Sequence, residues 1–154
     1  MITNRQKIVS LTPTIGVDAY TANDVVGGLL TFDIANVGGG GIVRWARIVD
    51  DDNEKAELAL YLFSDLPSTI ADDAAFAPTV ADLKKLAGKV LFEAADYETV
   101  NGNAWVIRGR GSDAIDIDCS LATNNIYGYL VCTGTPTYTA ATDLTISLGV
   151  WLDG

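Results

Sequence analysis

The pattern that most constrains the fold lies in residues 144–152, where apolar residues alternate strictly with small, polar or aromatic ones. Leucine, isoleucine or valine stands at 144, 146, 148, 150 and 152, and Thr, Ser, Gly and Trp stand between them. Successive side chains of a β-strand point to opposite faces, so this period predicts a strand with one buried face. The same alternation places Trp151 on the face turned away from that core.

Shorter β-prone runs occur through the rest of the chain and are separated by turn residues. We expect strands at 7–11, 29–34, 42–49, 58–63, 89–94, 104–108, 114–119 and 126–132. Strands this short and this regularly interrupted favour a sandwich or barrel, and eight strands in two antiparallel sheets form a jelly roll. The sequence therefore predicts an all-β, jelly-roll-like antiparallel β-sandwich of about eight strands. Within it, 42–49 and 56–63 are expected to form a hairpin around the acidic turn 50–54.

One segment has helical character. Thr79 and Asp82 have the spacing of a capping box, with Asp in place of the usual Glu, and apolar residues follow at 80, 83, 86 and 87. Gly88 stands where a C-cap glycine would end a helix. We expect one short helix near 80–87. No change of composition marks a second domain, so we expect an N-terminal arm or first strand at 1–12 and a single domain at 13–154.

Histidine is absent from the 154 residues, which excludes His-based triads, Cys–His pairs and HExxH zinc sites. Twenty acidic residues against ten basic ones leave a net charge of −10, so we expect no nucleic-acid partner. No apolar run approaches the roughly 20 residues of a membrane span, and no secretory leader is visible. We therefore expect no membrane partner and synthesis in a cytoplasm.

Three patterns that could carry chemistry have simpler structural explanations. Residues 109–114 fit a dinucleotide glycine pattern, but strand-like alternation follows where a phosphate-binding helix should begin. The acidic groups at 50–54 and 113–118 are more simply solvated turns than calcium sites, which stay an open alternative. Cys119 and Cys132 lack further zinc ligands and are more simply buried free thiols than a disulfide. We expect no catalytic residue, metal or cofactor, and a protein that is not an enzyme.

Each of the three tryptophans lies in a predicted strand. Core positions are expected for Trp45 and Trp105, whereas Trp151 should point outward. An outward aromatic side chain can anchor a protein interface or stack on a sugar ring.

Several segments, taken in order, resemble a family of small virion proteins of tailed bacteriophages. They are Leu11–Ile15 with Ala19–Phe32, Ala56–Phe63, Asp73–Pro78, Tyr127–Tyr138 and Asp143–Gly149. The resemblance implies a jelly-roll decoration, or cement, protein that stabilises a capsid by bridging its major capsid protein subunits. Its place would be the outer capsid surface of the virion, after synthesis in the host cytoplasm. A tail, baseplate or head-fibre component is the alternative, and a carbohydrate-binding β-sandwich module is a third possibility.

The implied partners are the major capsid protein and further copies of this chain, with a homotrimer slightly preferred over a dimer. The N-terminal arm, with Arg5 and Lys7, is the predicted reaching contact. The candidate interface residues are Ile2, Arg5, Lys7, Tyr20 and Trp151.

Overall fold

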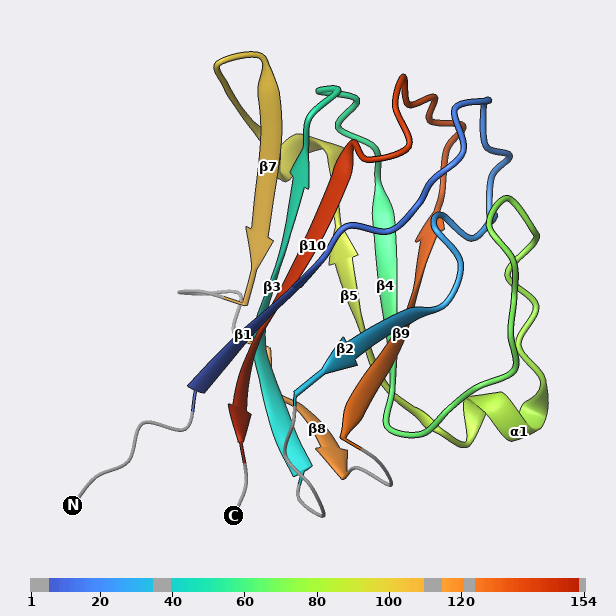
Figure 1. The fold of residues 1–154 in the computed structure, drawn as a ribbon, viewed down its shortest axis with the longest axis vertical. Coiled ribbons are helices and arrows are strands. Elements are labelled where there is room, and N and C mark those ends of the chain that lie inside the picture. The colour runs from blue at the N-terminus through green and yellow to red at the C-terminus, as the bar shows by residue number, and fades with distance from the viewer. Residues whose placement is uncertain (1–5, 35–39, 110–114, 121–123, 153–154) are drawn as a thin grey trace.

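The computed structural model describes residues 6–34, 40–109, 115–120 and 124–152. Within these ranges two antiparallel sheets pack face to face (Figure 1). The first sheet contains β1 (Gln6–Leu11), β10 (Leu144–Leu152), β3 (Gly40–Asp50), β7 (Asn103–Arg108), β6 (Glu98–Val100) and β8 (Ile117–Ser120). The second contains β2 (Leu30–Asp33), β9 (Asn125–Cys132), β4 (Leu58–Phe63) and β5 (Leu86–Phe92). The helical elements are α1 (Val80–Leu83) and the 3₁₀ turn η1 (Ala94–Asp96).

The strand order is that of a jelly roll. The first sheet runs β1-β10-β3-β7-β6, with β8 paired to β3, and the second runs β2-β9-β4-β5. If the short strands β6 and β8 are set aside, each sheet has four strands, and most consecutive strands fall in opposite sheets. This interleaving of two Greek keys defines the jelly roll and confirms the predicted fold class.

The prediction that 42–49 and 56–63 form a hairpin is wrong. β3 pairs with β10, β7 and β8 in the first sheet, whereas β4 pairs with β5 and β9 in the second. The acidic turn instead carries the chain across the sandwich. Asp50 is buried there and accepts hydrogen bonds from the backbone N–H groups of Asp52 (2.9 Å) and Lys55 (3.0 Å), which closes the turn.

The core between the sheets consists of the inward side chains of both. Phe32, Leu60 and Leu130 of the second sheet are buried together with Ile48 and Leu148 of the first. The alternation predicted for 144–152 is confirmed, since the residues at 144, 146, 148 and 150 are all fully buried. Cys119 and Cys132 are buried free thiols in opposite sheets, as expected.

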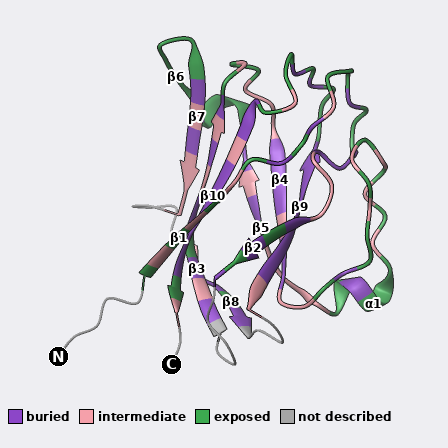
Figure 2. Cartoon of the chain, viewed as in Figure 1, coloured by how far each residue is buried: buried purple, intermediate pink, exposed green. Residues whose placement is uncertain are grey.

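The outward face of the second sheet is also covered. Phe63, Tyr127 and Tyr129 form an outer cluster with Val25 and Val131, and the loop residues Leu29, Ile70 and Phe76 pack against it. The covering segment, residues 64–79, connects β4 to α1. Figure 2 accordingly shows β4 and β9 largely buried, whereas β1 and β6 carry exposed residues.

The helix is shorter than predicted. The capping box is present, because Asp82 N–H donates to Thr79 Oγ1 and Thr79 N–H donates to the Asp82 carboxylate. However, α1 ends at Leu83, and Gly88 lies inside β5 rather than at a C-cap. A Cβ at Gly88 would lie 3.0 Å from the Ile117 side chain, so the glycine makes room for packing between the sheets. Pairing of Leu86 with Phe63 outweighs the helical spacing.

Asp82 makes the stability of this corner dependent on pH. Its carboxylate accepts hydrogen bonds from the N–H groups of Ser68 (2.8 Å) and Thr79 (2.9 Å), which lower its pKa from 3.8 to about 2. A depressed folded-state pKa stabilises the fold above the unfolded-state pKa, and this stabilisation is lost as the pH falls toward the folded-state value. Asp82→Ala should therefore be less stable than the parent at neutral pH, with the difference in melting temperature narrowing between pH 4 and pH 2.

The matched control is Asp51→Ala, which removes an exposed carboxylate from another turn. Melting curves of the three proteins across this pH range would test the role of Asp82. A difference between Asp82→Ala and the parent that stays constant with pH would contradict it.

Candidate protein interface

The outward face of the first sheet carries all three tryptophans. Cross-strand partners in an antiparallel pair lie on the same side of the sheet. Because Leu148 and Val150 face the core, Gly149 and Trp151 face outward. Trp45 lies opposite Gly149, and Trp105 lies opposite Val49 on the same side. We call this surface the tryptophan face.

No described element lies beyond this sheet on its outward side (Figure 1). The two outer faces of the sandwich therefore differ, since residues 64–79 cover the face of the second sheet. Trp151 is 54% exposed, and Ile8, which lies on the same side of the neighbouring strand β1, is 58% exposed. The tryptophan face is thus an apolar surface without a partner in the described part of the chain.

Trp45 is buried, but not where the sequence predicts. It is 4% exposed and belongs to neither apolar cluster, because it lies on the outward face rather than between the sheets. Gly149 allows this position, since any Cβ there would overlap the Trp45 indole. The β3–β10 register shifts beside Gly149, which marks a bulge next to the indole. The expected core position of Trp105 is also wrong, because this side chain is half-buried on the same outward face.

Two arginines of β3 lie against the tryptophans. The Arg44 guanidinium carbon lies 5.6 Å from the Trp151 ring centroid, and that of Arg47 lies 5.6 Å from the Trp45 centroid. Arg47 also donates to Ser147 Oγ at 3.2 Å. Trp and Arg are, with Tyr, the residues enriched at energetic hot spots of protein interfaces. The tryptophan face therefore combines cations and aromatic rings on a chain whose net charge is −10.

The ion pair between Arg44 and Asp116 contributes little stability. Its atoms are 3.8 Å apart, and the two side chains are 46% and 71% exposed. Exposed pairs of this kind are worth about 0–1 kcal/mol, because water screens the charges. Arg44 therefore keeps most of its capacity to interact with a partner.

The structure places the predicted interface residues in different environments. Trp151 lies on the tryptophan face, and Lys7 lies half-buried on β1 opposite Val150. Tyr20 is 2% exposed, and its hydroxyl donates to Asp72 (2.6 Å) and accepts from Gly16 N–H (2.7 Å). Burial, followed by the hydrogen bond to Asp72, raises the Tyr20 pKa. Tyr20 is therefore not on the surface of the single chain, while Ile2 and Arg5 lie outside the described residues.

Sequence reasoning missed Ile8, Arg44, Arg47 and the outward orientation of Trp105. Ile8 alternates with inward-facing neighbours in β1, so the period of that strand could have revealed it. The bulge in β3 breaks the period of 42–49 between Val43 and Ala46, both of which face the core. No simple alternation could therefore have placed Trp45.

The other candidate sites offer less. There are two open depressions of about 360 Å³ each. One is lined by Glu54 and Glu57, and the other by residues 11–14, 27 and 29–31. Across the described ranges, no group of three or more acidic or cysteine side chains is arranged to hold a metal ion. Residues 110–114 of the glycine pattern lie outside the described residues. The element that follows them is the strand β8 rather than a helix. None of the described helices is long and apolar enough to cross a membrane.

Comparison with known proteins yields only remote structural likeness. No family model matches the chain, and no curated protein sequence matches it. The chain is similar in structure to PRD1 vertex protein P5 (11% identity, TM-score 0.36, covering 96% of this chain and 95% of that chain). It is also similar to a Caldicellulosiruptor saccharolyticus CBM27-1 solved with mannohexaose (10%, 0.39, 94% and 80%) and to a chain of the Kashmir bee virus empty particle (12%, 0.34, 100% and 92%). Likeness at this level does not carry function.

Proposed function

We propose that this protein is a non-catalytic structural component of a tailed-phage virion that decorates and stabilises the capsid. The observation that carries the proposal is the tryptophan face, where Trp151 and Ile8 are exposed and no described segment covers them, so that they offer an apolar contact to the major capsid protein. The ordered sequence segments that resemble small virion proteins supply the virion context. Tail, baseplate and head-fibre positions are the alternatives within the same class.

Charge favours a position on the outer capsid surface. A chain with a net charge of −10 is repelled by packaged nucleic acid, so its favourable position is on the side of the shell away from the genome. Arg44 and Arg47 then supply local positive charge at the contact, where they can pair with acidic groups of the capsid protein.

A carbohydrate-binding role is the second candidate, and one observation favours it. The Trp151 indole is exposed and lies against the Arg44 guanidinium, which limits its motion. An outward aromatic ring held in this way can stack on a sugar ring. Replacing Trp151 by alanine tests both candidates, and the ligand whose binding is lost, capsid or glycan, separates them.

Trp151→Ala is expected to leave the fold intact and to weaken capsid binding. Because Trp151 is exposed, its removal leaves no core cavity. A hot-spot tryptophan contributes about 2 kcal/mol or more to binding, which corresponds to roughly a thirtyfold increase in Kd. Binding to purified, expanded and undecorated capsids, measured by co-sedimentation, would test this expectation.

Leu66→Ala is the matched control, because Leu66 is 49% exposed but lies on the segment that covers the second sheet. Unchanged capsid binding by Trp151→Ala would contradict the assigned surface. If the parent protein fails to bind capsids at all, the decoration role is wrong. Glycan-array binding that is lost in Trp151→Ala would favour the carbohydrate role.

A further inference from the structure

Among the described strands, one edge of β1 has no partner. β1 stands at the end of the strand order of the first sheet, and the only described strand that it pairs with is β10. Figure 1 shows β1 at the edge of the first sheet; β2 of the second sheet lies nearby, but no described strand pairs with the other edge of β1. In an antiparallel strand, alternate residues direct their N–H and C=O groups toward each side. β1 therefore presents a row of backbone donors and acceptors that another strand can pair with.

Charge makes this edge the part of the chain best suited to meet a second copy. Residues 1–17 contain no acidic residue, and the first acid in the sequence is Asp18. Elsewhere, twenty acidic side chains would repel an identical molecule. Ile8 of β1 and Trp151 of the adjacent strand β10 are exposed, apolar and on the same outward side. An open backbone edge and an exposed apolar strip thus occur together where the repulsion is weakest.

The strand is also complementary to itself. When two antiparallel copies of β1 meet with the two-fold axis at Ile8, the two Ile8 side chains lie opposite each other on the outward side. Gln6 then lies opposite Ser10, and both face outward. Lys7 lies opposite Val9 on the inward side, so no like charges are paired. A lysine on an edge strand can block pairing, but in this register it does not meet its own copy.

We infer that two copies of the chain pair through the free edge of β1 and form a two-fold dimer in which the first sheets become one continuous sheet. Such an isologous contact closes with two copies, so it favours a dimer over the trimer that was slightly preferred from sequence. Antiparallel pairing within one sheet keeps both outward faces on the same side. The dimer therefore presents two tryptophan faces as one broad surface.

Cysteine crosslinking of the purified full-length chain tests the register. Ile8→Cys should form a disulfide-linked dimer under mild oxidation, seen on a non-reducing gel. Val100→Cys is the matched control, because Val100 has the same 58% exposure but lies on β6 at the opposite end of the sheet. The native Cys119 and Cys132 are buried and should not contribute. Equal crosslinking of the two variants would overturn the inference.

Light scattering provides a second, independent measurement. The parent should reach twice the monomer mass of 16.3 kDa as its concentration rises, and Ile8→Glu should raise the dimer Kd at least tenfold, whereas Val100→Glu should not. A parent that stays monomeric, a threefold mass, or an Ile8→Glu protein that dimerises like the parent would each overturn the inference. Because these experiments contain no capsids, their outcome does not depend on the proposed virion function.

Discussion

Gly109→Ala is expected to destabilise the sandwich by about 3 kcal/mol or more and to lower its Tm by roughly 10 °C. Gly109 has φ +101°, a left-handed conformation that costs most residues about 1–3 kcal/mol. A Cβ there would also overlap the carbonyl oxygen of Arg44 and would lie 2.8 Å from the Trp45 Cα. Both obstacles are backbone atoms of β3, so no side-chain rotation can relieve them.

Gly109→Ala should also disturb the tryptophan face. Gly109 and Gly149 lie against Trp45 from opposite sides, so a displaced β3 backbone moves the indole out of its buried position. We therefore expect a red shift of tryptophan fluorescence together with the lower Tm.

Gly102→Ala separates the effect of conformation from that of the clash. Gly102 also has a positive φ, +81°, but a Cβ there would meet no atom within 4 Å. Its replacement should cost only about 1–2 kcal/mol. If the two alanine variants unfold at the same temperature, contact with β3 is not the reason that position 109 requires glycine.

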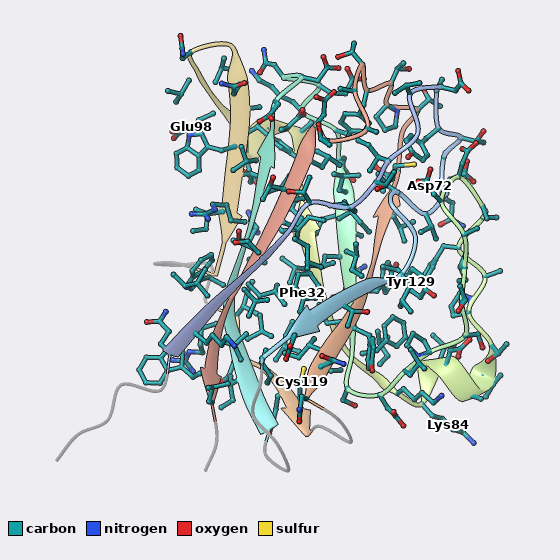
Figure 3. The ribbon with its side chains drawn as sticks, viewed as in Figure 1. Phe32, Asp72, Lys84, Glu98, Cys119 and Tyr129 are labelled. Atoms are coloured by element: carbon teal, nitrogen blue, oxygen red, sulfur yellow. The ribbon has the colours of Figure 1, made fainter. Side chains whose placement is uncertain are left out.

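Tyr129→Ala is the second change for which we expect a large effect, a loss of about 3–5 kcal/mol. The Tyr129 ring packs edge-on against Phe63, with centroids 6.0 Å apart, and also contacts Phe76 at 5.8 Å. Its hydroxyl donates to Ser68 O (2.5 Å) and accepts from Ile70 N–H (2.9 Å). One side chain therefore ties residues 64–79 to the second sheet (Figure 3). Chemical denaturation would measure the loss.

Tyr129→Phe isolates the contribution of the hydroxyl. It keeps the ring but leaves two backbone groups of the covering segment without their partner, which should cost about 1–3 kcal/mol. Amide exchange at Ile70 should accelerate, because the segment opens more often. Tyr61→Phe is the control, since Tyr61 lies opposite Tyr129 on the same face and its hydroxyl makes no hydrogen bond with described residues. Equal exchange at Ile70 in both variants would show that the Tyr129 hydroxyl does not hold the segment.

Local patterns in the sequence predicted local structure well. The alternation at 144–152 identified a strand and the side on which Trp151 lies, because side-chain direction in a strand depends only on position. The capping box of Thr79 and Asp82 was likewise recognisable, since both of its hydrogen bonds lie within one helical turn. The fold class and most of the strands followed from such local signals repeated along the chain, although about eight strands were expected and the described residues form ten, including the unpredicted β6.

Predictions that depended on distant partners were less successful. Residues 42–49 and 56–63 have the composition of a hairpin, yet their strands belong to different sheets, where β3 pairs with β10, β7 and β8, and β4 pairs with β9 and β5. Gly88 follows a helical pattern, but the helix yields to a strand that can pair with β4. As an aromatic residue of a predicted strand, Trp45 is expected in the core, whereas a bulge in β3 and a glycine on β10 place it on the outward face of the first sheet.

The sequence by itself determined that this chain forms short antiparallel strands around an apolar core, that it has no histidine-based chemistry, and that Trp151 points outward. These properties depend on composition and on the two-residue period of a strand. Only the tertiary structure decided which outer face of the sandwich is covered by residues 64–79 and which face carries the three tryptophans without a further described segment over it, leaving Trp151 exposed. Both faces carry aromatic residues. The two faces differ in burial because a face is buried only where a distant segment packs against it. Strand pairing between residues far apart in the chain determines which segments lie close enough to do so.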